Sequence, residues 1–113
     1  MQIIREKVTL DELKEMSKKM QNSLVKAVVD VERHIMAIDA GMHADEEMEL
    51  LEDGSLQENL WGINIYPYES ADDWIEFDSM INMRPSYGNR SRGVDDIKTQ
   101  EIIKKIVNSL VTR

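Results

Sequence analysis

A chain of 113 residues with a formal net charge of −8 and no cysteine can hold one modest hydrophobic core. It cannot form a disulfide, a thiolate metal site or a cysteine nucleophile, and its acidity argues against duplex nucleic acid as a partner, because phosphates would be repelled. No segment approaches the roughly twenty apolar residues of a membrane helix, and the first residues lack the apolar run of a secretory signal. We therefore expect a single domain over residues 1–113, in the cytoplasm and without a membrane partner.

The first expected helix covers residues 10–22. Thr9 and Glu12 have the spacing of a capping box, in which each side chain accepts a hydrogen bond from the other residue's backbone N–H. Apolar side chains then recur at helical spacing, at Leu13, Met16, Met20 and Leu24. Ahead of this helix, residues 3–4 are compatible with a short edge strand.

After Leu24 the apolar pattern changes from helical to extended. Residues 26–31 and 35–40 are rich in β-branched and other apolar side chains, and polar residues separate them, so they predict a hairpin. The acidic residues 44–51 are good helix formers followed by a turn signal at 53–55, which predicts a short helix.

Two further strands and a final helix complete the predicted order. Residues 60–66 and 74–84 each end at a proline and are expected to pair in antiparallel fashion. Residues 95–110 predict a helix whose apolar stripe consists of Ile102, Ile103, Ile106, Val107 and Leu110. The expected fold is an α+β two-layer sandwich, with an antiparallel sheet of about four strands and the N- and C-terminal helices on one face.

Charge is strongly segregated along the chain. No lysine or arginine occurs between Arg33 and Arg84, and residues 34–83 carry thirteen carboxylates. The middle of the chain must therefore take its cations from the two ends, from another subunit or from a bound metal ion.

Strand alternation predicts a polar face on the sheet. Side chains of one parity on the expected strands are aliphatic, and those of the other parity include Asp30, Asp39, Asn64, Glu76, Asp78, Asn82 and Arg84. A solvated sheet face is the simpler interpretation. Self-association as a homodimer is the alternative, because a second copy could supply the missing cations.

The acidic middle also contains a candidate metal site. His43 together with Asp39 and Asp78 could bind a divalent cation such as magnesium, manganese or zinc. The spacing matches no established metal motif. The alternative is that the carboxylates of residues 45–49 only complement the positive end of a helix dipole.

A basic loop before the last helix is a candidate site for a small anionic ligand. It contains Arg84, Asn89, Arg90 and Arg92, with glycines that leave backbone amides accessible and a helix N-terminus that follows. The alternative is that these arginines pair with the acidic middle and tie the loop to the sheet.

Four runs resemble one family: residues 43–47 (HADEE), 57–67 (QENLWGINIYP), 75–85 (IEFDSMINMRP) and 88–92 (GNRSR). The family consists of short bacterial and archaeal proteins known only as a domain of unknown function. The resemblance implies a stand-alone cytoplasmic prokaryotic protein and brings no activity, cofactor or catalytic residue.

Three functions remain open from the sequence, and it does not decide whether the protein is an enzyme. The first is a non-enzymatic ligand- or partner-binding domain that forms a homodimer. The second is a divalent-metal-dependent enzyme acting on a phosphate-containing substrate. The third is an RNA-binding protein or toxin-like ribonuclease that uses the basic loop, a function that the acidic surface disfavours.

Overall fold

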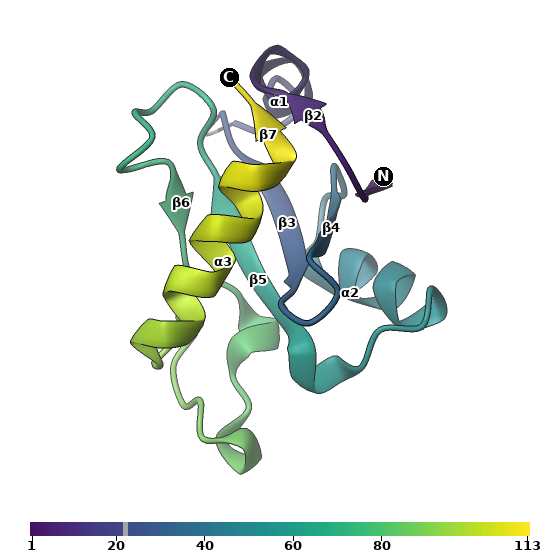
Figure 1. The fold of residues 1–113 in the computed structure, drawn as a ribbon, viewed down its shortest axis with the longest axis vertical. Coiled ribbons are helices and arrows are strands. Elements are labelled where there is room, and N and C mark those ends of the chain that lie inside the picture. Colours follow the sequence, from purple (N-terminus) through teal and green to yellow (C-terminus); the bar gives the residue numbers. More distant parts are fainter. Residues whose placement is uncertain (22) are drawn as a thin grey trace.

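The computed structural model describes residues 1–21 and 23–113 and has an α+β fold around a five-stranded sheet (Figure 1). The strand order is β1-β4-β3-β5-β6, and every neighbouring pair is antiparallel. The strands are β1 (Gln2–Ile4), β3 (Val25–Asp30), β4 (Ile35–Ile38), β5 (Leu60–Ile65) and β6 (Ile75–Glu76). A separate parallel pair joins β2 (Val8–Thr9) to β7 (Val111–Thr112). The expected α+β class, edge strand and antiparallel hairpin are confirmed, with one strand more than the four expected.

The three α-helices are α1 (Leu10–Ser17), α2 (His43–Glu52) and α3 (Ile97–Leu110). The capping box is confirmed, because the Thr9 hydroxyl accepts from the Glu12 N–H and the Glu12 carboxylate accepts from the Thr9 N–H. The expected extent of this helix, residues 10–22, is too long. The N–H groups of Lys18 and Lys19 bond three residues back, which tightens the chain into turns, and residue 22 lies outside the described residues. No helix in the described residues has the length and apolar character needed to cross a bilayer.

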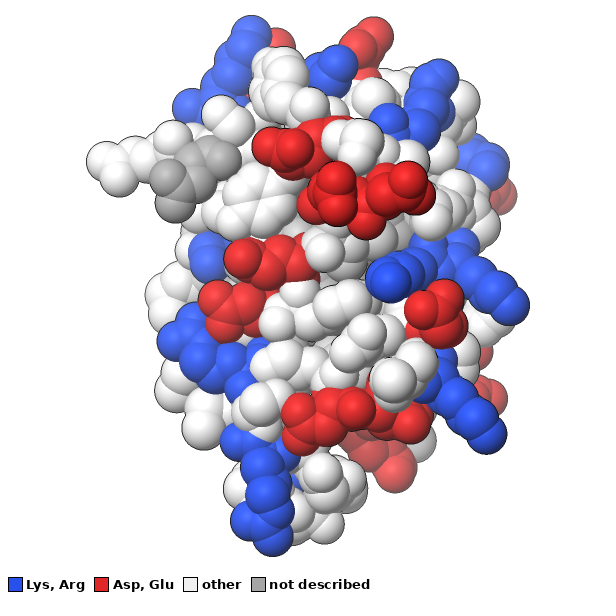
Figure 2. Space-filling view, turned by 90° about the vertical axis from the view of Figure 1, so that its left-hand side faces the viewer, with Lys and Arg blue, Asp and Glu red and all other residues white. Residues whose placement is uncertain are grey.

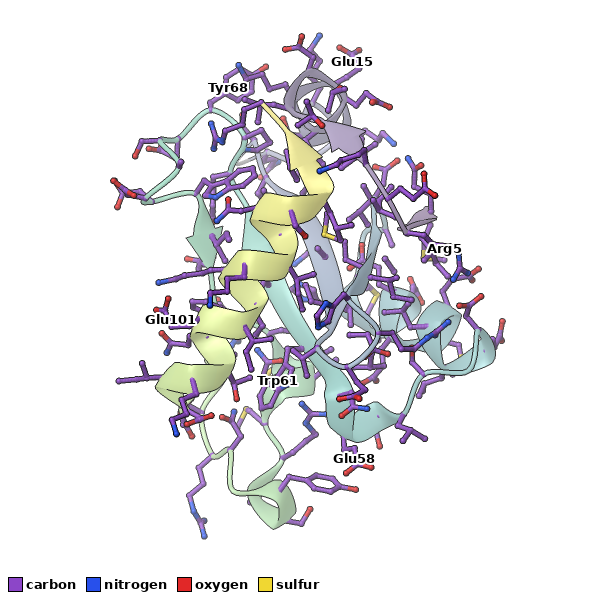
Figure 3. The ribbon with its side chains drawn as sticks, in the orientation of Figure 1. Arg5, Glu15, Glu58, Trp61, Tyr68 and Glu101 are labelled. Carbon is purple, nitrogen blue, oxygen red and sulfur yellow. The ribbon has the colours of Figure 1, made fainter. Side chains whose placement is uncertain are left out.

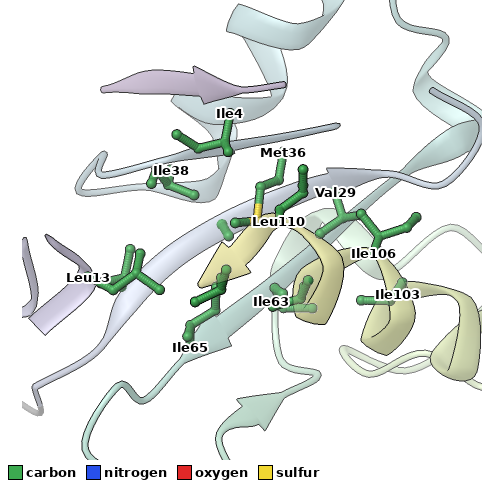
Figure 4. Close-up of a cluster of buried hydrophobic side chains, with 14 of the residues drawn as sticks. Ile4, Leu13, Val29, Met36, Ile38, Ile63, Ile65, Ile103, Ile106 and Leu110 are labelled. Atoms are coloured by element: carbon green, nitrogen blue, oxygen red, sulfur yellow. The ribbon is translucent and has the colours of Figure 1, made fainter. Parts of the chain in front are cut away.

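The main core lies between the sheet and α3 (Figure 4). Strand residues of one parity point into it together with side chains of α3, and Figure 1 shows α3 running across this face of the sheet. Helix α1 stands at the end of the sheet, where it contributes Leu13 to the same core. The core members that carry the packing include Val29, Met36, Ile63, Ile65, Ile103 and Ile106.

The opposite face of the sheet is also covered, in part by α2, and the expected placement of the N- and C-terminal helices together on one face is not confirmed. Val28, Ala37 and Leu60 have the other strand parity and form a second cluster with Leu50 of α2. Polar side chains are buried on this side as well, whereas a solvated face would leave them exposed. The sheet face that was expected to be solvated is therefore a second, smaller interior that contains both apolar and polar side chains.

The expected strand over residues 74–84 is wrong beyond Glu76, where β6 ends. Asn82 lies beside β5, where its side-chain oxygen accepts from the Gly62 N–H (2.8 Å) and its Nδ2 donates to the Gly62 carbonyl (2.9 Å). A side chain thus replaces the backbone of the missing strand. Gly62 permits this approach, because a Cβ there would stand 2.5 Å from the Cβ of Ser79. Residues 80–82 turn in a short 3₁₀ helix instead.

Candidate anion-binding pocket

A row of polar side chains crosses the second face of the sheet. Lys26 of β3 pairs in register with Asn64 of β5, which in turn pairs with Glu76 of β6. The Asn64 side chain donates through Nδ2 to Glu76 Oε1 (2.8 Å) and to the carbonyl of Asp78 (3.4 Å). Because Nδ2 has two acceptors, the orientation of this amide is defined by its partners. Alternation correctly placed Asn64 and Glu76 on the same face.

The other end of the Asn64 amide lacks a partner. Its Oδ1 is buried, and no described residue donates a hydrogen bond to it. Asn64 as a whole is 6% exposed and lines a pocket of about 250 Å³. A buried acceptor without a donor costs on the order of 1–3 kcal/mol, so such atoms are rare in folded proteins. A residue of the pocket wall thus carries an acceptor that no described residue satisfies.

The N-terminus of α2 forms another wall of this pocket. Met42 is the N-cap residue, and no side chain caps the helix there. Met42, His43 and Ala44 all line the pocket. The first N–H groups of a helix have no partner within the helix, and the dipole makes this end attractive to a negative group.

His43 contributes an acceptor to the same wall. Its Nε2 lies 2.7 Å from the carbonyl of Ile63, which can only accept, so Nε2 carries the hydrogen. Burial lowers the pKa of the His43 imidazole below its ordinary value, which favours the neutral ring. The Nδ1 atom then keeps its lone pair and acts as an acceptor or a base.

Two cationic side chains border the pocket. Arg92 donates from Nε to Asp78 Oδ1 (2.7 Å), and its two terminal nitrogens have no hydrogen-bond partner among residues 1–21 and 23–113. Lys26 forms no ion pair within that same part of the chain. The polar pocket, by which we mean the space lined by Lys26, His43, Asn64, Asp78 and Arg92, thus has cations as well as acceptors.

Four of the residues singled out in the sequence meet here, although they came from three separate hypotheses. His43 and Asp78 belonged to the metal hypothesis, Asn64 to the polar face and Arg92 to the basic loop. Asp39 lies elsewhere, in a bidentate ion pair with Lys19 at 2.9 Å. The described residues contain no group of three or more His, Cys, Asp or Glu side chains that could hold a metal ion. The structure therefore does not bring the three expected metal ligands together.

Two other arginines of the basic loop, Arg84 and Arg90, do not line the pocket. Arg84 donates to the carbonyls of Gln57 and Leu60 and lies 4.5 Å over the ring of Trp61, and burial lowers its pKa. Trp61 is labelled in Figure 3. The side chain of Arg90 is exposed and forms no ion pair with a described residue. Of the loop arginines, Arg92 alone pairs with a carboxylate of the acidic middle in the described part of the chain.

The two asparagines of this region organise the loop. Asn89 donates from Nδ2 to the carbonyls of Asn82 and Gly93, each at 2.8 Å, and its Oδ1 accepts from the Asp95 N–H. Asn82 also donates to the carbonyl of Arg92 (2.9 Å). Because their amides are used by backbone groups, Asn82 and Asn89 position Arg92 and are not themselves free for a ligand.

The acidic middle takes cations from both ends of the chain, which was one of the three expected sources. Asp53 accepts from Arg5 (2.6 Å) and from Arg33 (2.8 Å), and these bonds hold the pKa of its carboxyl below the ordinary value. In the described part of the chain, the other ion pairs to this segment are Lys19 with Asp39 and Arg92 with Asp78. Figure 2 shows acidic and basic groups interspersed on the side of the molecule that carries β6.

Sequence reasoning missed Lys26 and Glu46. Lys26 shares strand parity with Val28, so alternation could have placed it beside Asn64. Glu46 is completely buried on α2, although it belongs to an acidic run that was expected at the surface. Burial raises its pKa to about 9, so the carboxyl is neutral near pH 7, and it accepts from the Ala40 N–H at 3.1 Å. The sequence pattern that indicates the burial of Glu46 is its helical spacing with the buried residues His43 and Leu50.

A family model described as Protein of unknown function (DUF5674) matches residues 2–110. The chain therefore belongs to this family, which agrees with the resemblance seen in its motifs. No curated protein and no solved structure matches it.

Proposed function

We propose that this member of the DUF5674 family is a ligand-binding protein, and that its polar pocket holds a small anion that also carries a hydroxyl or amine group. The observation that carries the proposal is the buried, unpartnered Oδ1 of Asn64 in the pocket wall. A buried acceptor without a donor costs free energy, and a ligand that supplied the donor would recover that cost.

The surrounding groups specify both parts of such a ligand. Lys26, Arg92 and the uncapped end of α2 would bind the negative group, by charge and by backbone N–H donation. Asn64 Oδ1 and His43 Nδ1 are acceptors and would bind the hydroxyl or amine. Asp78 orients Arg92 through the Nε contact.

Calorimetric titration of the full chain with lactate and with propionate tests this directly. The two acids share a carboxylate and a similar size, but only lactate has the hydroxyl donor. We expect lactate to bind more tightly by about 5- to 10-fold, which corresponds to one hydrogen bond of about 1 kcal/mol. Equal affinity for the two acids would contradict the role of Asn64.

The loop offers a matched pair of variants for the anion. Arg92→Ala removes a cation from the pocket, whereas Arg90→Ala removes the same charge from an exposed neighbour outside it. We expect Arg92→Ala to weaken lactate binding at least 10-fold and Arg90→Ala to leave it within about 2-fold, since charge-assisted hydrogen bonds contribute about 1.5–3 kcal/mol. A similar loss in both variants would indicate general electrostatic attraction and not a site.

Self-association as a homodimer is part of the same proposal and is supported by an apolar surface on α3. Ile97 and Ile102 are 70% and 42% exposed, and Ile102 borders an open apolar hollow together with Val31 and Ile106. Sedimentation velocity should show a dimer that Ile102→Lys converts to a monomer. A monomer at all concentrations up to the millimolar range would exclude this part of the proposal. The metal-dependent and ribonuclease hypotheses gain no supporting observation from the described residues.

A further inference from the structure

We infer that the ligand is amphipathic, with an apolar part that occupies a second pocket adjoining the polar one. This inference rests on the proposed function and extends it to the class of ligand. The second space, here called the apolar pocket, has Met16, Met20 and Leu24 among its lining residues and a volume of about 200 Å³. Lys26 and Gly41 line both pockets, so the two spaces are neighbours, and we call the region of these two shared residues the junction.

The chemistry of the apolar pocket differs from that of its neighbour. Methionine side chains are unbranched and adapt to irregular apolar groups, and Leu24 adds a buried aliphatic wall. Lys19 and Asp39, two charged residues of its lining, form an ion pair with each other at 2.9 Å. They neutralise one another and do not call for a second charged group on the ligand.

Gly41 lies where the two pockets adjoin. A Cβ built on Gly41 would meet no atom within 4 Å, and its backbone is not in the left-handed region, so neither space nor strain requires glycine there. A larger residue could therefore be introduced without disturbing the fold, and we expect it to reduce the space at the junction.

The arrangement of charge sets the orientation of the ligand. The head group would lie among Arg92, Asn64 and the end of α2, and the Lys26 ammonium would lie at the junction. A 2-hydroxy acid with an unbranched alkyl chain meets these requirements, since its carboxylate, its hydroxyl and its alkyl chain are all attached to the same carbon, C2. Such acids are probes of the chemistry and not an identification of the natural ligand.

The test is a calorimetric series of 2-hydroxy acids of increasing chain length, from lactate to 2-hydroxyoctanoate, on the full chain. Each added methylene that enters the apolar pocket should tighten binding by up to about 4-fold, from about 0.8 kcal/mol per buried methylene. If lactate binds and longer acids bind no more tightly, the inference is overturned and the proposed function stands. If no acid of the series binds, both fail.

Two variants at the junction localise the effect. Gly41→Leu should bind lactate as the unchanged protein does but lose the gain with chain length, whereas Gly41→Ala, which is too small to close the junction, should keep it. A length dependence that survives in folded Gly41→Leu would overturn the proposed path. Thermal unfolding confirms that each variant is folded, and the length series on the unchanged protein tests the inference even if Gly41→Leu is destabilised.

Discussion

The two faces of the sheet are buried by different means. On the α3 side the interior is aliphatic, and non-directional burial holds it together. On the α2 side, buried polar groups such as Glu46, Asn64 and Asn82 lie among the apolar ones. The first face needs only side chains of suitable size and polarity. The second depends on specific hydrogen bonds, and its stability responds to pH because it contains the titratable Glu46. It also contains the Asn64 Oδ1, which has no partner among the described residues.

The largest effect is expected on the aliphatic face. Ile103 is completely buried on the inner side of α3, and Ile103→Ala should lower the free energy of unfolding by about 3–4 kcal/mol through lost burial and an unfilled cavity. Urea denaturation measures the loss. Lactate affinity should not change in the folded fraction, and a change would show that the two faces are coupled.

The next effect concerns the polar side. Asn82→Leu conserves size but leaves the Gly62 N–H, the Gly62 carbonyl and the Arg92 carbonyl without their partner. We expect a loss of about 2–3 kcal/mol together with weaker anion binding, because Arg92 is then no longer held in place. Asn108 is exposed, so Asn108→Leu is the matched control. It should change neither the free energy of unfolding nor anion binding. Full anion affinity in Asn82→Leu would contradict the positioning role of this asparagine.

A third comparison uses pH. The pKa of Glu46 rises from 4.5 in the unfolded chain to about 9 in the folded one, so the folded state retains a proton that the unfolded state releases. This contribution to stability is complete below about pH 4.5 and is lost as pH rises towards 9. Glu46→Gln removes the dependence and should stabilise the protein by about 2 kcal/mol at pH 7, with no gain at pH 4.

Urea denaturation of Glu46→Gln at several pH values measures this profile, with Glu52→Gln, an exposed residue of the same helix, as its control. His43 has the opposite effect on the pH dependence of stability. Because burial lowers its pKa, stability should fall as pH drops below about 6.5, the ordinary value for histidine. A Glu46→Gln profile parallel to that of the unchanged protein would show that Glu46 ionises normally.

The smallest effect is expected at the border of the polar pocket. The Arg92 and Asp78 side chains are 55% and 42% exposed, so water screens their ion pair. Arg92→Ala should therefore change the free energy of unfolding by less than about 1 kcal/mol, while its effect on ligand binding is large. A large loss of stability in urea denaturation would make Arg92 structural and remove its value as a test of the site.

The same contrast explains what the sequence could predict. The aliphatic face followed from periodicity, because Ile63, Ile65 and the stripe of α3 repeat at the spacing of their elements. Alternation failed at Ser79 and Asn82, where side chains bond to the backbone and compete with a strand. Such bonds depend on partners distant in sequence, as between Asn82 and Gly62, and no local pattern encodes them.

The candidate site was predictable only in parts. Asn64, His43, Asp78 and Arg92 stood out as polar residues in apolar or glycine-containing surroundings, but their meeting in one pocket required the path of the chain after β6. Glu46 was hard to recognise among its acidic neighbours, since an acidic run is usually exposed and only the helical spacing with His43 and Leu50 marks the member that faces inward. Family membership confirmed the resemblance and left the chemistry to be argued from the site.

The parallel pairing of Val8 with Val111 has a consequence for the order of folding. Nearly the whole described chain lies between these two residues, so β2 cannot acquire its partner until the last turn of α3 has been made. During synthesis, the antiparallel sheet can assemble before β2 has paired with β7. Contacts this distant in sequence close late, and the junction of β2, α1 and β7 should be among the last parts of the molecule to become protected from hydrogen exchange.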